Sequence, residues 1–191
     1  ADDSCYKSIG PILIDRVGFC NHTEKGNEKI LLSFGTSFKT SWVEEFLQTL
    51  PTNYQYVLTT CGEQLKIPGS HIEVVDFVDF ETISQDIKFA IIHGGQGTVY
   101  AMASQGIPFI GIPFFNEQFW NIKKFSEKKC AYLVKDSNSV NIQEVMNYFE
   151  QHYSMFKDNI VQLSRNIKCE SEESLKKAEV EIEKFVRNRE L

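Results

Sequence analysis

The sequence predicts an α/β fold with a Rossmann-like parallel sheet, helices on both faces of the sheet and extra C-terminal helices. Three observations support this prediction. Short apolar runs alternate with segments of helical periodicity along the chain, which is the pattern of repeated βαβ units. Most runs are apolar throughout, as expected for strands that are buried on both faces. Beyond residue 140 the strand signal ends, and the composition is that of helices.

The elements follow one another in a regular order. Expected strands cover residues 29–34, 54–60, 72–77, 89–92, 107–112 and 131–134. Expected helices cover residues 41–50, 98–105, 141–150, 154–169 and 171–189, with a short polar helix ending near Gln85 and another helix beginning near Glu117. Parallel strands need right-handed crossovers, and such sheets bind ligands beyond the carboxyl ends of their strands. The segments SFGTS, DFVD and HGGQGT all lie at such ends, which predicts one shared site.

The last expected helix is charged and has one apolar stripe. Its members are Leu175, Ala178, Ile182, Phe185 and Val186. A stripe with this spacing usually packs on the core of its own domain. We therefore expect it to pack on the core; the alternative is a partner surface, which would leave the stripe partly exposed.

Composition excludes several classes of protein. The 191 residues suffice for one domain, and the net charge of −6 disfavours a nucleic-acid protein, which needs a basic face. No apolar run approaches the roughly 18–20 residues of a membrane span. The five cysteines are Cys5, Cys20, Cys61, Cys130 and Cys169. They form no CxxC pair and no zinc-ligand spacing with the histidines, so we expect reduced thiols, no metal and a cytoplasmic protein.

The stretch 89–121 carries the chemistry. A buried strand ends at Ile92, and His93-Gly94-Gly95-Gln96-Gly97 forms a turn before a helix. Glycines let a ligand approach the backbone, and the first N–H groups of a helix have no partner inside it. A phosphate or pyrophosphate fits such a place. The alternative is a tight turn without a ligand, and neither GxGxxG nor GxxxxGK[ST] is present.

The order of HGGQGT, Gly106-Ile107-Pro108, Glu117-Gln118 and Asn121 resembles the donor-binding signature of GT-B nucleotide-sugar glycosyltransferases. The UDP-glucuronosyl and UDP-glucosyltransferases are the most similar, with the macrolide and sterol glycosyltransferases. Together with SFGT (Ser33 to Thr36) and the segment IGPIL, the resemblance covers most of the chain. It implies that residues 29–191 form the donor-binding half of a GT-B fold. Residues 1–28 would then lead in from an N-terminal domain.

The resemblance also implies roles for individual residues. The donor diphosphate would be bound by His93, Gly95, Gly97 and Thr98. Sugar hydroxyls would be bound by Glu117, Gln118 and Asn121. The uracil would stack on Phe77, with the backbone of Val78 at the base edge, and the loop Gly35, Thr36, Ser37 would approach the phosphates or the acceptor.

Structural alternatives stay open for three of these residues. His93 has the alternative of a backbone-bonded histidine, Glu117 that of a solvated helix start, and Phe77 that of a core side chain. One position departs from the family: relatives usually carry a ribose-binding Glu eight residues after the histidine, where this chain has Ala101. A lost contact of this kind costs on the order of 1–3 kcal/mol.

The resemblance implies inverting transfer of a hexosyl group from a UDP-sugar to an acceptor hydroxyl, with no metal and no cofactor beyond the UDP-sugar co-substrate. The general base would come from an acceptor-binding N-terminal domain or partner subunit, so no catalytic residue is assigned to this chain. Membrane association would come only through that partner. Two alternatives remain: a stand-alone subunit of a split glycosyltransferase, and a non-catalytic nucleotide-binding module, which Ala101 favours. A sugar-nucleotide epimerase fits less well, because the Glu117-Gln118 pair suits transferases.

Overall fold

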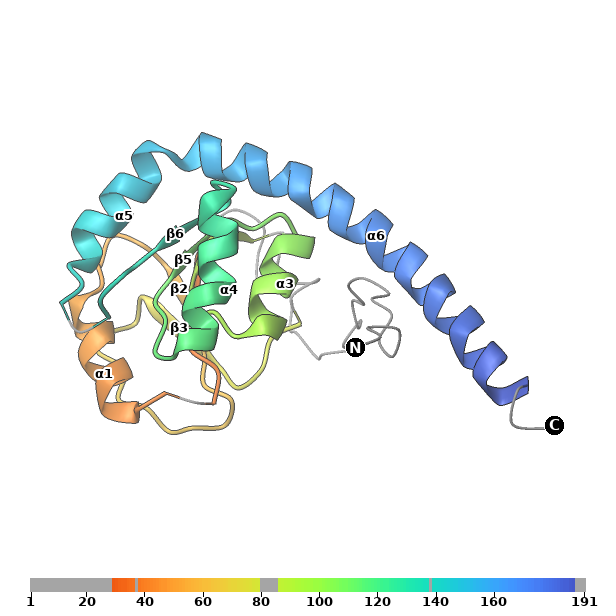
Figure 1. Ribbon diagram of the computed structural model, residues 1–191. Helices are drawn as coiled ribbons and strands as arrows, with labels where there is room; N and C mark the ends of the chain where they lie inside the picture. The colour runs from red at the N-terminus through yellow and green to blue at the C-terminus, as the bar shows by residue number, and fades with distance from the viewer. Residues whose placement is uncertain (1–28, 37, 80–85, 138, 188–191) are drawn as a thin grey trace.

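The computed structural model has a sheet between two layers of helices and a long final helix that extends beyond the domain (Figure 1). The structure describes residues 29–36, 38–79, 86–137 and 139–187. Several predictions lie outside these residues. They concern the lead-in 1–28 with its two cysteines, Ser37, and the short helix ending near Gln85.

The sheet has six strands, and every neighbouring pair is parallel. The strands are β1 (Lys29–Ser33), β2 (Tyr56–Thr59), β3 (Ile72–Val75), β4 (Ile87–Ile92), β5 (Phe109–Gly111) and β6 (Ala131–Leu133). Their order is β3-β2-β1-β4-β5-β6, which is the order of a doubly wound nucleotide-binding sheet. The α/β prediction is confirmed, and each predicted strand is present.

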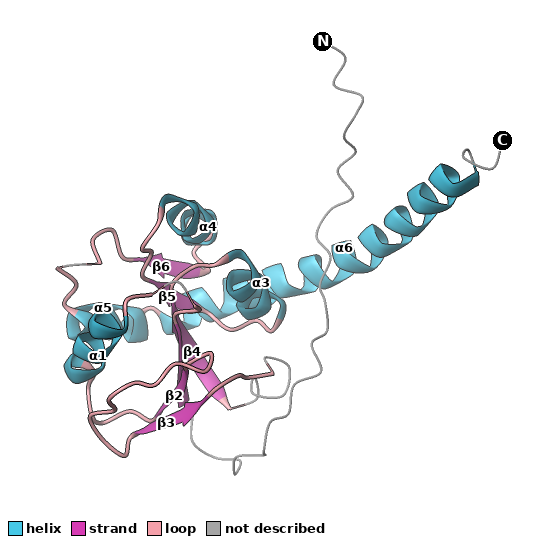
Figure 2. Cartoon of the chain, turned by 90° about the horizontal axis from the view of Figure 1, so that it is seen from below, coloured by secondary structure: helices cyan, strands magenta, loops and turns pink. Residues whose placement is uncertain are grey.

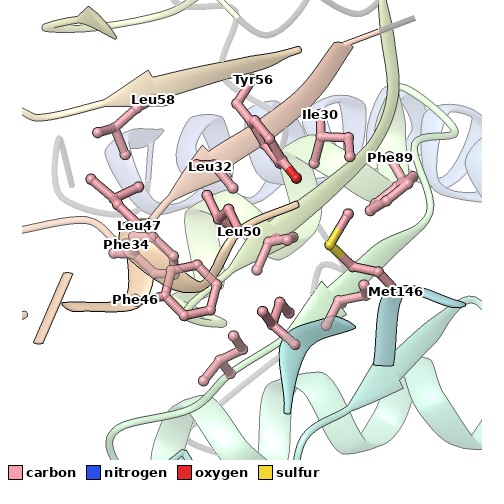
Figure 3. Packing of buried hydrophobic residues seen from close by; sticks show 14 of the residues in the cluster. Ile30, Leu32, Phe34, Phe46, Leu47, Leu50, Tyr56, Leu58, Phe89 and Met146 are labelled. Atoms are coloured by element: carbon pink, nitrogen blue, oxygen red, sulfur yellow. The ribbon is translucent and has the colours of Figure 1, made fainter. Parts of the chain in front are cut away.

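Helices α1 (Thr40–Thr49) and α5 (Ile142–Gln151) cover one face of the sheet. Figure 3 shows their contact with the strands: Phe46 of α1 and Met146 of α5 pack against Leu32, Leu58 and Phe89 of the sheet. The predicted apolar face of α1 is confirmed, because Phe46 and Leu50 are buried and Trp42 stacks on Phe46 at 5.1 Å. The core between this face of the sheet and the two helices is a continuous cluster of aromatic and aliphatic side chains.

Helices α3 (Gln96–Ser104) and α4 (Asn116–Glu127) cover the opposite face (Figure 2). Helix α3 begins two residues earlier than predicted, so Gln96 and Gly97 belong to its first turn and not to the loop. The last helix, α6 (Tyr153–Arg187), touches both faces, with Phe156 in one core cluster and Ile160 in the other.

Helix α6 also holds the amino-terminal edge of the sheet. Three of its side chains donate to backbone carbonyls just before or at the start of strands: Tyr153 to Lys88 at 3.1 Å, Lys157 to Gly106 at 2.8 Å, and Asn159 to Lys129 at 3.2 Å. These contacts of α6 therefore lie opposite the carboxyl edge of the strands. That edge is where doubly wound sheets bind their ligands.

Two predictions about the C-terminal segment are wrong. The expected helices 154–169 and 171–189 are one helix of 35 residues, because neither glycine nor proline interrupts residues 153–187. The expected burial of its stripe also fails, since Leu175, Ile182 and Val186 are 50%, 63% and 49% exposed. The helix is about 50 Å long at the rise of an α-helix, and Figure 1 shows its second half running past the domain.

No helix in the described part of the chain is both long enough and apolar enough to cross a membrane. The exposed half of α6 has charged pairs along its surface, for example Lys177 with Glu173 at 3.7 Å and Lys184 with Glu181 at 2.9 Å. Pairs of this spacing help a helix that has little tertiary support.

The side chain of Ile122 in α4 packs above two glycines. A Cβ on Gly94 would lie 2.4 Å from Cδ1 of Ile122, and a Cβ on Gly111 would lie 2.5 Å from its Cγ2. Both distances are shorter than any real contact, so a Cβ at either position would force Ile122 to move. Gly94 also has a φ of +92°, which other residues rarely adopt. The turn after β4 is therefore packed from above by α4.

We expect Gly94→Ala to lower the free energy of unfolding by about 1–3 kcal/mol more than Gly62→Ala does. Gly62 has a similar φ of +87° but has no atom within 4 Å of its Cβ position, so the control isolates the clash with Ile122 from backbone strain. Urea unfolding of the two variants measures the difference. Equal losses would show that α4 does not depend on this contact.

Candidate functional site

The predicted glycine turn lies where the sheet changes direction. β1 and β4 are neighbours, but β1 leads to α1 on one face and β4 leads to α3 on the other. Such a switch point opens a crevice beyond the carboxyl ends of the two strands. His93 follows β4 at this point and Gly35 follows β1. The sheet order thus brings two segments together that are far apart in the sequence.

His93 is bonded to the end of β1. Its ring nitrogen Nδ1 lies 3.2 Å from the carbonyl oxygen of Ser33, and its backbone N–H donates to the same oxygen at 3.2 Å. A carbonyl only accepts, so Nδ1 carries the proton in this bond. In the neutral ring the other nitrogen, Nε2, is then unprotonated. The backbone bond that was the alternative interpretation of His93 is therefore present, but it uses only one of the two nitrogens.

Glycine backbone packs closely against the other side of the ring. A Cβ on Gly95 would lie 2.5 Å from Nε2 of His93, and a Cβ on Gly35 would lie 2.9 Å from it. Burial lowers the pKa of His93 below its ordinary value of 6.5, while the bond to Ser33 and the carboxylate of Glu117 act in the opposite direction. The net effect favours a neutral imidazole at neutral pH.

The start of α3 is open. Its N-cap is Gly95, no side chain caps it, and its first turn contains no acidic residue. The first N–H groups of a helix point away from its body and carry a partial positive charge. Gly97, in this first turn, is exposed, and a Cβ there would meet no atom within 4 Å. Packing therefore does not require glycine at this position, whereas close approach of a ligand to the backbone would.

The start of α4 is closed by its own residues. Oε1 of Gln118 accepts from the backbone N–H groups of Phe114 at 2.8 Å and Phe115 at 3.2 Å. Gln118 is only 4% exposed. Its oxygen is thus used in the first turn, and any contact to a sugar would come from the amide nitrogen. That role stays a prediction.

Asn121 connects α4 to the glycine turn. Its Nδ2 donates to the carbonyl oxygen of Gly94 at 3.1 Å and to Oε1 of Glu117 at 2.8 Å. The carboxylate of Glu117 is exposed, and it is near enough to His93 to influence its pKa. The residues predicted for diphosphate and sugar therefore surround one region at the carboxyl edge of the sheet.

Comparison with known proteins identifies the family. A model of the family described as UDP-glucoronosyl and UDP-glucosyl transferase matches residues 86–189, more than half of the chain. The chain belongs to this family. The predicted family resemblance is confirmed, and the matched segment contains both the His93 turn and the start of α4.

Human proteins of the UDP-glycosyltransferase family match a shorter segment. The chain is 34% identical over 80 residues to UDP-glucuronosyltransferase 2B17 and 32% identical over 80 residues to UDP-glucuronosyltransferase 2B15. Each match covers 41% of the chain and 15% of the relative.

Solved structures of GT-B glycosyltransferases share the fold. The glycosyltransferase of kitacinnamycin superposes with a TM-score of 0.72 at 20% identity, over 94% of this chain and 49% of that protein. The calicheamicin glycosyltransferase CalG4 gives 0.73 at 16% identity, over 91% and 46%. The chain thus spans about half the length of these enzymes, and the prediction of one half of a GT-B fold is confirmed.

Other predicted site residues lie further from His93. Phe77 follows the edge strand β3, three strand spacings or about 14 Å from β4. It is 70% exposed, which excludes the core alternative and leaves its ring open to a ligand. Val78 beside it is half-buried, and Thr36 is exposed near the end of β1. Their roles as base-binding and phosphate- or acceptor-binding residues stay predictions.

Sequence reasoning missed Ser33 and Ile122. Ser33 acts through its backbone carbonyl, which leaves no mark on residue type, although a polar residue ending a buried strand was a weak signal. Ile122 is one apolar residue among several on α4, and only the two glycines beneath it distinguish it. Ala101 is half-buried among residues of the core cluster beneath α3.

Among the described residues no group of three His, Cys, Asp or Glu side chains lies close enough together to hold a metal ion. The three described cysteines, Cys61, Cys130 and Cys169, are free thiols. Burial raises the pKa of the Cys130 thiol to about 11. This thiol is consequently protonated and a poor nucleophile or metal ligand at neutral pH.

We expect the free energy of unfolding to fall in acid, because His93 is buried in its neutral form. The pKa of His93 is lower in the folded chain than in the unfolded chain. Its contribution to the free energy of unfolding is therefore complete above pH 6.5 and is lost as the pH falls through the pKa of the folded chain. His93→Asn keeps an amide donor near the position of Nδ1 and does not titrate. The difference in unfolding free energy between wild type and variant should be constant above pH 6.5 and shrink below it. A difference independent of pH from 5 to 8 would contradict the assignment.

Proposed function

We propose that the chain binds a UDP-sugar as the donor half of a hexosyltransferase that inverts the anomeric carbon. The observation that carries this proposal is the convergence of His93, the open start of α3 and the carboxylate of Glu117 at one switch point. A diphosphate needs hydrogen-bond donors and positive potential, and a sugar needs acceptors for its hydroxyl groups. Membership of the UDP-glycosyltransferase family supports uridine as the base.

The chain's part in the reaction is to hold the donor and to stabilise the departing diphosphate. Charge develops on the diphosphate oxygens as the bond to the sugar breaks. Fixed amide dipoles at the start of α3 meet that charge without reorganisation, which is electrostatic catalysis by a preorganised site. His93 stands beside these amides, and a metal is not required for this mechanism. The base that deprotonates the acceptor would come from an acceptor-binding N-terminal domain or partner subunit.

A non-catalytic nucleotide-binding module is the second candidate. Ala101 favours it, because the position of the family's ribose-binding carboxylate holds a methyl group. Transfer to an acceptor, measured after the chain is joined to the acceptor-binding half of a relative, separates the candidates. A domain that binds UDP-sugar but never supports transfer would be the module.

Calorimetric titration of the 191-residue chain with UDP tests donor binding. We expect binding that weakens about tenfold or more in His93→Ala, the usual effect of losing a hydrogen bond to a charged group. His152→Ala is the control, since His152 is also bonded through Nδ1 to a backbone carbonyl, that of Tyr148 at 2.8 Å, but lies between α5 and α6. Absence of UDP binding by the wild type would overturn the proposed function.

Gly97→Ala should separate stability from binding. A methyl group in a helix stabilises it by about 0.5–1 kcal/mol relative to glycine, and the Cβ leans toward the helix N-terminus, over the open amides. The variant should therefore unfold at higher urea concentration and bind UDP more weakly. Gln96→Ala, which changes the same turn without adding a new Cβ, should bind UDP normally. Undiminished UDP affinity in Gly97→Ala would show that the ligand does not approach this turn.

A further inference from the structure

We propose that Asn121 is a positioning residue that fixes the Glu117 carboxylate at a set distance from the diphosphate turn, and that it does not itself bind the sugar. The inference rests on the proposed function and refines it, because the family resemblance alone places Asn121 among the sugar ligands. It assigns recognition of the sugar hydroxyl to Glu117 and preorganisation of that contact to Asn121.

The number of N–H donors on the Asn121 side chain supports these different roles for Asn121 and Glu117. A side-chain amide has two N–H donors, and Nδ2 of Asn121 has two acceptors within hydrogen-bond distance, Gly94 O at 3.1 Å and Glu117 Oε1 at 2.8 Å. Both donors are thus used inside the protein. Glu117 keeps its second carboxylate oxygen, Oε2, for which no hydrogen bond occurs among the described residues. Asn121 keeps only its neutral amide oxygen, Oδ1, as an acceptor for a sugar hydroxyl, whereas Oε2 of Glu117 is a carboxylate oxygen and accepts the stronger, charge-assisted bond.

The two partners of Asn121 belong to the two parts of the proposed site. Gly94 is in the turn that leads to the α3 amides, and Glu117 is in the first turn of α4. In a nucleotide-sugar the terminal phosphate and the sugar ring are covalently joined, so the ligand itself fixes the separation between phosphate oxygens and sugar hydroxyls. Asn121 fixes the matching separation in the protein.

Preorganisation has a clear physical benefit here. Glu117 is exposed, and an unrestrained glutamate loses rotamer freedom when a ligand orders it. A carboxylate already held by a charge-assisted bond at 2.8 Å loses less. Asn121 is itself anchored, because the next residue, Ile122, packs against the backbone of Gly94 and Gly111. The bond therefore starts from a rigid part of the domain.

The test uses the sugar increment, defined as the Kd for UDP divided by the Kd for the UDP-sugar. Titrations with UDP, UDP-glucose and UDP-glucuronate are made on wild type, Asn121→Leu, Glu117→Ala and the double variant. We expect Asn121→Leu to lower the increment about tenfold, with the Kd for UDP changed less than twofold. In the Glu117→Ala background, Asn121→Leu should change the increment no further, because Asn121 acts through Glu117.

Asn147→Leu is the matched control and should leave the increment unchanged. Asn147 also lies on a helix and bonds a side chain four residues earlier, accepting from Gln143 Nε2 at 3.1 Å, but on α5. Circular dichroism and urea unfolding establish that each variant is folded. If Asn121→Leu does not fold, the isosteric Asn121→Asp repeats the cycle, since it removes the same two donors.

Three results would overturn the inference while leaving the proposed function intact. Equal weakening of UDP and UDP-sugar would make Asn121 merely structural. A further loss of increment in the Glu117→Ala background would make Asn121 a direct sugar ligand. If the wild type binds UDP and both UDP-sugars with the same affinity, the sugar adds nothing to binding. Asn121 then has no contact between Glu117 and the sugar to position. A chain that binds no uridine nucleotide would overturn the proposed function and this inference together.

Discussion

The site depends on the parallel pairing of β1 with β4. This pairing places the carbonyl oxygen of Ser33 where both the backbone and the ring of His93 bond to it. The two bonds join the ends of strands that are 60 residues apart. They also decide which nitrogen of His93 carries its proton, and so which nitrogen is left unprotonated in the neutral ring. Every other feature of the candidate site is arranged around that ring.

The amino-terminal and carboxyl edges of the sheet differ in their structural roles. Helix α6 bonds the amino-terminal edge through side chains such as Lys157 and Asn159, so that edge is structural. At the carboxyl edge the chain supplies glycine turns and helix starts, which expose backbone donors. Stability and function are thus separated in space. A destabilising change at the α6 contacts would act on folding without altering the chemistry of the crevice.

Much of this could be predicted from sequence, for identifiable physical reasons. Buried parallel strands are apolar throughout, and a glycine turn before a helix has few alternatives, so the β4–turn–α3 unit, the six strands and the parallel α/β fold were accessible. The order of the strands within the sheet was not predicted, because it depends on pairing between distant segments. The continuity of α6 was missed because the sequence was divided into two helices at Glu170, although no helix-breaking residue stands there. Burial of Leu175 and Ile182 was wrong because periodicity tells which residues share a face, not what that face meets. The bonds of Asn121 depend on α4 docking over Gly94, a tertiary contact with no local signature.

The net charge of −6 does not conflict with an anion site, because the two helix starts at the carboxyl edge differ. At α4 the acid Glu117 stands in the first turn, so a negative charge already lies near the positive end of that dipole. Gln118 accepts from the N–H groups of Phe114 and of the N-cap residue Phe115. At α3 the first turn has no acid and no cap, and its field is left for a ligand. Local placement of carboxylates therefore makes the start of α3 more favourable for an anion than the start of α4. In the proposed function, the Glu117 carboxylate would then meet a neutral, hydroxyl-bearing group beyond the phosphates.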